Sequence, residues 1–216
     1  IILVIGTLLY WRKKLIKKLE ESASKTVSVR TDSILHSIKA MFITLALALP
    51  FPLILFATYN LLNILSAPAL ITEQLAASLL NASLLVLILG GMRYTCRPKG
   101  LGEKHFHWSP VAVHSFYKEL TWAIPFGAIL TIVTGINTDV LNPANEQVIG
   151  RLSFIFLMFG LLILVYRLWH PNSPIIKNAK TKAQNPAWLQ LHFIWFAALL
   201  LIPAMLIWST ISGYYY

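Results

Sequence analysis

The feature that most constrains this chain is a long apolar stretch without a charged side chain. No Asp, Glu, Lys or Arg occurs between Ala40 and Asn60. A helix of this length is about 30 Å long, which matches the hydrocarbon thickness of a bilayer. We therefore expect a membrane-spanning helix here, and the rest of the fold has to be compatible with it.

Two prolines, Pro50 and Pro52, lie near the middle of this stretch. Proline lacks the backbone donor that a helix needs at each interior position, so it ends or kinks a helix in water. In a packed membrane bundle, neighbouring helices and local 3₁₀ turns can satisfy the freed carbonyl groups. The stretch is therefore predicted to continue across the bilayer as one kinked helix.

The composition extends this interpretation to the whole chain. Of its 216 residues, 57% are hydrophobic and only 12% are charged, whereas a soluble domain has about 25% charged residues. We predict an all-α, polytopic transmembrane helix bundle of about six spans, in one region that is a piece of a longer polypeptide. The expected spans cover residues 1–19, 34–63, 75–92, 113–136, 148–169 and 187–211.

The distribution of basic residues predicts the orientation of the spans. All 18 Lys and Arg except Arg151 fall in the first, third and fifth connecting segments or at their edges. Cytoplasmic loops of membrane proteins carry an excess of Lys and Arg. Both ends of this region are therefore expected outside, and the net charge of +10 is assigned to membrane topology, with no nucleic-acid partner.

Basic and aromatic residues next to the spans predict contacts with membrane lipids, most of all anionic ones. A Lys or Arg near an anionic membrane surface contributes about 1 kcal/mol of attraction, and Trp favours the interface. The alternative, that the basic residues only set topology, stays open. The candidate headgroup contacts are Arg12, Lys13, Lys14, Arg93, Arg97, Lys99 and Trp108.

Prolines and glycines inside the spans raise two further hypotheses. The prolines either act as hinges that bend as bilayer tension changes or form static kinks that shape the bundle. These candidate hinges are Pro50, Pro52, Pro125 and Pro203. The glycines either permit close helix contact or leave gaps of lipid size. They are Gly127, Gly135 and Gly160.

Few residues suggest catalysis or ligand chemistry. His105, His107 and His114 lie near Cys96, but this set is too sparse for a zinc site, and the cysteine has no identified base. Glu119 lies near the end of a span, where an interfacial anchor is expected. We predict no catalytic residue, metal or cofactor. A transporter subunit, a lipid-acting membrane enzyme that uses the three histidines, and an accessory membrane protein are the alternatives.

Three stretches together resemble a known family. LALPFPLIL (Leu47–Leu55), CRPKGLGEKHFHWSP (Cys96–Pro110) and IGRLSFIF (Ile149–Phe156) are similar to the membrane region of the large MscS-like mechanosensitive channels of the MscK and MscM type. In that family these segments lie in extra helices that precede the pore.

The resemblance implies a channel, not an enzyme, that opens on bilayer tension in hypo-osmotic shock. It also implies a homo-heptamer in the bacterial inner membrane, in which these helices surround the pore and sense tension. The pore helix and the cytoplasmic domain, which this sequence does not contain, are the expected partners within the same longer chain.

Overall fold

A computed structural model describes residues 2–25, 34–65, 70–98, 100–104, 106–136, 143–182 and 191–213 of the chain. All regular secondary structure in these ranges is α-helical, which confirms the predicted all-α bundle. The helices are α1 (Ile2–Lys25), α2 (Ile34–Ala48), α3 (Pro50–Leu65), α4 (Leu70–Thr95), α5 (Leu101–Lys104), α6 (Pro110–Ile136), α7 (Pro143–Trp169), α8 (Pro174–Lys182) and α10 (His192–Ile211).

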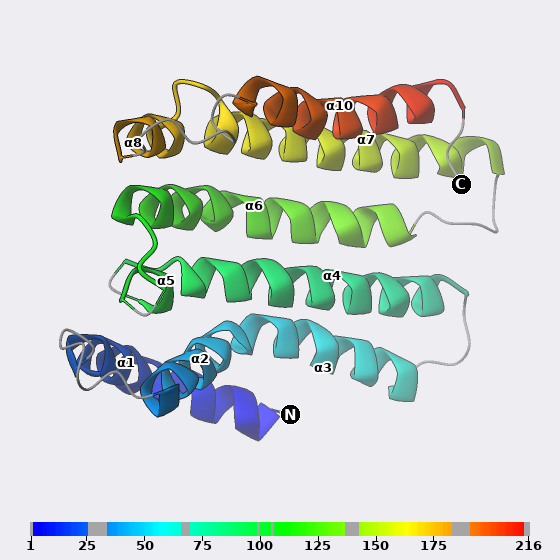
Figure 1. Ribbon diagram of the computed structural model, residues 1–216. Coiled ribbons are helices and arrows are strands. Elements are labelled where there is room, and N and C mark those ends of the chain that lie inside the picture. Colours follow the sequence, from blue (N-terminus) through cyan, green and yellow to red (C-terminus); the bar gives the residue numbers. More distant parts are fainter. Residues whose placement is uncertain are drawn as a thin grey trace.

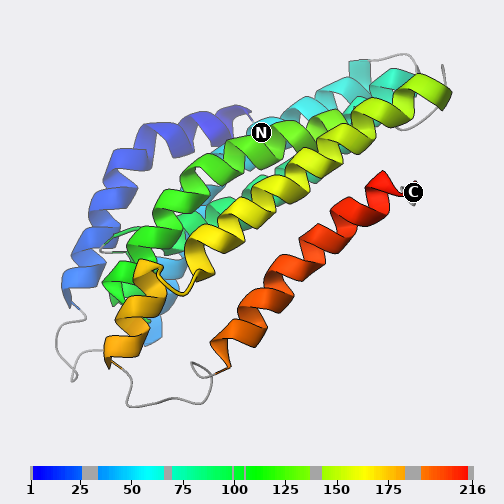
Figure 2. The same ribbon diagram turned by 90° about the horizontal axis from the view of Figure 1, so that it is seen from above.

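The long helices pack in a row that follows their order in the chain. Figure 1 shows α3, α4, α6, α7 and α10 one beside the next, and α4 contacts both α3 and α6, while α7 contacts both α6 and α10. Consecutive elements with short connections usually become neighbours in space. The result is an open row, with α1 and α10 at its two opposite edges (Figure 2).

Length and hydropathy identify three candidate membrane spans among the described residues, in α4, in a stretch that starts in α7, and in α10. The count rises to four if α2 and α3 form one bent span. Neither α1, which carries several lysines, nor α6, which carries Lys118 and Glu119, is among them. That these two helices also cross the membrane stays a prediction.

The expected single kinked helix of the second span is divided into two helices, α2 and α3, which meet at Leu49 with a bend of 49°. Leu49 still takes part in the hydrogen-bond ladder in both directions. Pro50 and Pro52, however, offer no N–H to the carbonyls of Ala46 and Ala48 four residues before them. Two missing donors within three residues explain a break sharper than a kink. We call this bend the elbow.

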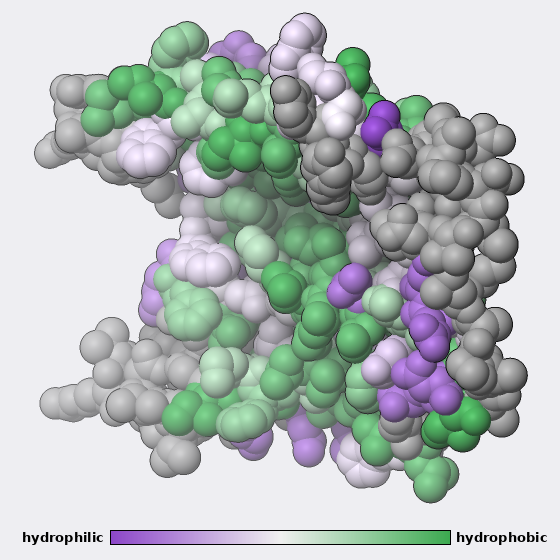
Figure 3. All heavy atoms as spheres, turned by 90° about the vertical axis from the view of Figure 1, so that its right-hand side faces the viewer, coloured by the Kyte–Doolittle hydropathy of each residue, from purple (hydrophilic) through white to green (hydrophobic). Residues whose placement is uncertain are grey.

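The basic connecting segments lie at one end of the bundle. α5 contacts α1, α2, α4 and α6, and α8 contacts α6 and α7, so both short helices lie at the same end (Figure 1). This end carries Lys104 in α5 and Lys177 and Lys180 in α8. On the described part of the opposite end face, apolar side chains cover much of the surface (Figure 3). The arrangement agrees with the predicted topology, and its cytosolic orientation stays a prediction.

Glycines bring α6 close to both of its neighbours. A side-chain carbon at Gly160 of α7 would collide with the ring of Phe126 on α6, and one at Gly135 of α6 would collide with Ser78 on α4. Small residues at such positions let helix backbones approach closely in a membrane, where packing replaces the hydrophobic effect as the source of association. At these two positions the glycines therefore serve close helix contact.

The turn after α4 buries the chain's only cysteine. Cys96 has almost no accessible surface, and burial raises the pKa of its thiol to about 11. The thiolate is the nucleophilic form of cysteine, so this thiol stays protonated and unreactive near neutral pH. The position therefore serves packing.

We expect Gly160→Val to destabilise the bundle, because the added methyl groups displace the Phe126 ring from its contact. Overpacking of this kind typically costs about 1–3 kcal/mol of unfolding free energy. Gly91→Val is the matched control, because no atom lies within 4 Å of the carbon that it adds. The measurement is thermal unfolding of both variants in the same detergent, and equal midpoints for the two would contradict the close contact.

We expect maleimide to label Cys96 in the folded chain about 100-fold more slowly than in the denatured chain at pH 8, because the raised pKa lowers the thiolate fraction by about that factor. Labelling of the folded chain should rise about tenfold per pH unit over the whole range from pH 7 to 9. Mass spectrometry of the peptide that carries Cys96 measures both rates. A rate that begins to level off toward pH 9 would show an ordinary, exposed thiol.

Candidate functional site

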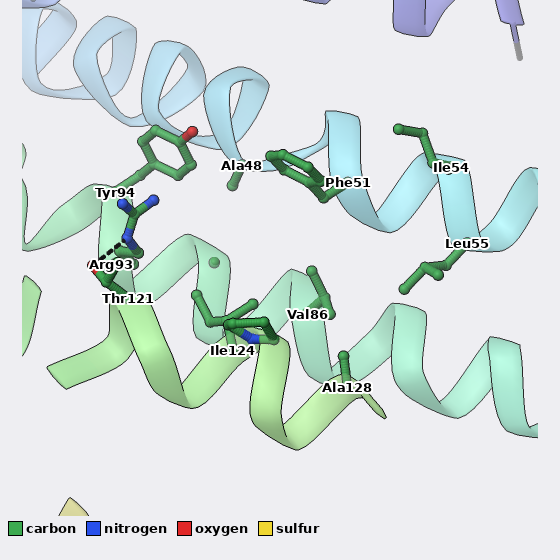
Figure 4. A pocket seen from close by; sticks show the side chains of 12 residues that line it. Ala48, Phe51, Ile54, Leu55, Val86, Arg93, Tyr94, Thr121, Ile124 and Ala128 are labelled. Carbon is green, nitrogen blue, oxygen red and sulfur yellow. Dashed lines mark hydrogen bonds between the residues drawn. The ribbon is translucent and has the colours of Figure 1, made fainter. Parts of the chain in front are cut away.

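A cavity of about 380 Å³ lies beside the elbow, between α2, α3, α4 and α6. Its walls are almost entirely aliphatic or aromatic, and Figure 4 shows their side chains directed into the space between α3 and the α4–α6 pair. The apolar wall includes Phe51, Leu55, Val86, Ile124 and Ala128. The polar groups of the lining gather at one end of the cavity, around Arg93.

Small residues and the bend together leave this space open. Gly90 lines the cavity, and a side-chain carbon there would meet only the carbonyl oxygen of Ala48, 4.0 Å away, at ordinary contact distance. Ala48 is the last residue of α2, and α3 turns away from that direction directly after it. The cavity therefore depends on the elbow and on the missing side chain at Gly90.

Arg93 is held in a fixed orientation at the polar end of the cavity. Its Nε donates to Thr121 Oγ1 (3.0 Å) and its Nη2 donates to the Tyr117 hydroxyl (3.2 Å). The guanidinium carbon also lies 4.6 Å from the centroid of the Tyr117 ring, a cation–π distance. Arg93 is in the last turn of α4, where the helix dipole favours a cation.

Tyr94 connects a second arginine to this end of the cavity. Its hydroxyl accepts a hydrogen bond from Arg12 Nη2 on α1 at 3.3 Å, and its ring lies 5.8 Å from the guanidinium carbon of Arg93. Leu19 of α1 is buried in the same cluster as Tyr94, which fixes α1 against the bundle. Two of the predicted headgroup residues, distant in sequence, thus meet around one tyrosine.

The other predicted headgroup residues do not line the cavity. Lys13 and Lys14 are exposed on α1, and Lys14 lies over the ring of Trp11. Arg97 is half-buried in the turn after α4 and has an interaction partner, while Lys99 lies outside the described residues. A headgroup contact at Lys13, Lys14 or Arg97 stays a prediction.

Trp108 belongs to a compact turn that contains the strongest of the family-like motifs. Its backbone N–H donates to the carbonyl of Gly102 (2.9 Å), and its ring covers the position where a larger residue at Gly102 would place a side chain. Phe106 packs beside the same ring. The indole is half-exposed, as a headgroup contact requires.

The four predicted hinge prolines occupy different surroundings. Pro50 and Pro52 form the elbow and are buried, and Pro125 lines the cavity on α6. Pro203 lies in α10, which packs against α7 and does not line the cavity. The structure thus brings three of the four together, and a hinge motion at any of them stays a prediction.

Glu119 is not the interfacial anchor that the sequence suggested. It is buried between α6 and α7, where its carboxylate accepts hydrogen bonds from Arg167 Nε (3.1 Å) and Trp122 Nε1 (2.7 Å). The partner arginine lies on the next helix, 48 residues later in the chain. The charge on Glu119 is thus occupied within the bundle and does not face the cavity.

The histidines that suggested a lipid-acting enzyme do not form a site in the described residues. His107 and His114 are both exposed, and His105 lies outside the described residues. Within the described ranges, no group of three or more His, Cys, Asp or Glu side chains could hold a metal ion. The cavity by the elbow is therefore the candidate functional site.

Comparison with known families agrees with this geometry. The family model described as mechanosensitive ion channel inner membrane domain 1 matches residues 1–216. No curated protein and no solved structure matches the chain. The family is one of channels, and the match confirms the resemblance inferred from the three motifs. Because the match covers the whole chain and the described residues form an apolar α-helical bundle, the protein belongs to the family of mechanosensitive ion channel inner membrane domains.

Proposed function

We propose that this domain senses bilayer tension and biases its channel toward the open state in hypo-osmotic shock. The observation that carries the proposal is the elbow. A segment long enough to cross the bilayer is bent by 49°, and an apolar cavity lies beside the bend. α4 contacts the bent segment, and Ser83 Oγ donates a hydrogen bond to the carbonyl of Pro52 (2.9 Å), so we expect the bend to change where the cavity leaves space between α3 and α6.

Membrane tension supplies the free energy for such a change. Tension favours states with a larger area in the membrane plane and a thinner bilayer, and helices adapt to thickness by changing tilt or bend. A two-state equilibrium shifts only by the difference in free energy between its states. A change in bend at the elbow provides such a difference, because it alters both the thickness that α2 and α3 match and the apolar surface that they bury.

The exposed surface of the domain supports a proposal about its surroundings. Large apolar side chains are exposed along α10, including Phe193, Trp195 and Trp208, as expected for a surface that meets lipid or further helices. We propose that the domain lies at the periphery of a homo-heptameric pore in the bacterial inner membrane, next to the pore and cytoplasmic domains of the same longer chain.

The distribution of polar groups favours this function over transport. A transporter site gathers polar groups near the middle of the membrane. In the elbow cavity they lie at one end, on Arg93, Tyr94 and Thr121, and the middle is apolar. The cavity therefore suits a contact with lipid better than the passage of a polar solute.

We expect Pro50→Ala combined with Pro52→Ala to raise the tension threshold of the full channel and to leave its conductance unchanged. The two alanines restore donors for the carbonyls of Ala46 and Ala48, each worth about 1 kcal/mol, and so favour a straighter segment, which matches a thicker bilayer than the one that tension favours. Patch-clamp recording under graded suction measures both quantities.

The control for this experiment is Pro110→Ala, at the first residue of α6. A proline at that position breaks no helical hydrogen bond, so the threshold should match the unmodified channel. An elbow variant with an unchanged threshold would remove the proposed hinge.

A further inference from the structure

We propose that the elbow cavity is a binding site for one acyl chain of an anionic phospholipid, whose phosphate is held by Arg93. This inference rests on the proposed function in one respect, that the domain contacts lipid. It goes further by naming the ligand, the groups that recognise each of its parts, and the depth at which it lies.

The size and lining of the cavity suit an acyl chain. Its volume of about 380 Å³ lies near the lower end of the range for ligand sites, which are mostly apolar with a few polar groups. Along α4 the lining extends from Arg93 to Val86, and along α6 from Thr121 to Ala128. Each of these distances is about 10 Å at the rise of a helix, which accommodates the upper part of one chain.

The cavity is accessible from the lipid side. Phe51 and Ile54, which line it on α3, are 58% and 42% exposed on the surface of the bundle. A phospholipid can therefore place one chain inside while its second chain stays in the surrounding bilayer. A ligand with a bulky polar body would have to pass these same apolar side chains, which excludes a sugar or a nucleotide.

Arg93 provides the charge for the phosphate. A guanidinium has five N–H donors, and Thr121 and Tyr117 occupy two of them. Among the described residues, no carboxylate lies within salt-bridge distance of Arg93, whereas Arg167 is paired with Glu119. A second arginine, Arg12, reaches this end through Tyr94, so the local charge around the remaining donors is positive.

The depth of the site also fits a headgroup. Arg93 lies in the last turn of α4, at the end of the bundle where α5 and α8 carry the basic connecting segments. A phosphate at this arginine would lie level with the other predicted interfacial residues, and the chain would extend from there toward the middle of the membrane. Arginine binds phosphate through paired N–H donors, which lysine cannot reproduce.

The test compares lipid retention by the full channel, purified in detergent and examined by native mass spectrometry. Phosphatidylglycerol is the probe, and phosphatidylcholine and palmitate are the comparison ligands. We expect Arg93→Gln to weaken phosphatidylglycerol retention at least tenfold and Arg93→Lys to weaken it less. Lys118→Gln is the matched control, because it removes an exposed charge from α6 at the same end without touching the cavity.

A second pair of variants tests the chain-binding part of the cavity without changing charge. Gly90→Leu fills the space beside Ala48 and should also reduce retention at least tenfold. Gly91→Leu adds the same side chain where no atom lies within 4 Å, and it should retain the lipid as the unmodified channel does. Size-exclusion profiles and thermal midpoints show which variants are folded. If a variant of the charge pair fails to fold, the glycine pair alone tests whether the cavity holds the lipid, and the reverse also holds.

Three results would overturn the proposal. Unchanged phosphatidylglycerol retention in a folded Arg93→Gln or Gly90→Leu channel would show that the cavity does not hold the lipid. An equal loss of phosphatidylglycerol retention in the controls Lys118→Gln and Gly91→Leu would show that retention depends on surface charge or side-chain size in general, and not on the cavity. Retention of palmitate in place of phosphatidylglycerol would identify a free fatty acid as the ligand. None of these measurements depends on gating, so an unchanged threshold in the elbow variant would refute the tension hinge and leave this site intact.

Discussion

The arrangement of this domain depends on two backbone donors that are missing in the middle of a membrane-length segment. In lipid there is no water to satisfy an exposed carbonyl group, so helices that cross a membrane keep their hydrogen bonds within the segment. Pro50 and Pro52 prevent this at two positions two residues apart, and the chain responds with the 49° elbow. Because α3 then leaves the direction of α2, the space beside Gly90 stays unfilled. The bend, the cavity and the surroundings of Arg93 thus have one physical origin.

The helices α4, α6 and α7 form the closely packed part of the bundle, next to the elbow. Close contacts at Gly135 and Gly160 join α6 to α4 and α7, and the ion pair between buried Glu119 and half-exposed Arg167 adds a charged link between α6 and α7. Removal of Arg167 would leave the buried carboxylate of Glu119 without its cation, which is destabilising. By contrast, the contact between the elbow and α6 is interrupted by the cavity. Under the proposed function we therefore expect movement at the elbow rather than across the whole row of helices.

Several features could be predicted from the sequence because they depend on local composition. The uncharged stretch at Ala40–Asn60 indicated a membrane helix, and the basic connecting segments indicated one charged end of the bundle. The positions of Pro50 and Pro52 predicted where the segment bends. They did not predict the bend angle, because missing backbone donors cause both kinks and breaks. The three stretches Leu47–Leu55, Cys96–Pro110 and Ile149–Phe156 together pointed to the channel family before any packing was known.

Other features depend on partners far apart in the chain. The sequence suggested an interfacial anchor at Glu119, because its partner Arg167 is 48 residues away. The role of the glycines, close contact or gap, was decided only when the structure placed Phe126 against Gly160 and Ser78 against Gly135. Likewise, the sequence placed Arg93 among seven equivalent candidates, and only the tertiary structure set it at the mouth of an apolar cavity beside Tyr117 and Thr121. By itself, the sequence determined that this protein is a helical membrane domain with a bend at two prolines, because hydropathy and missing donors act locally. The tertiary structure decided which charges are paired, which glycines are contacts and where space remains, because those properties belong to pairs of helices and to no single one.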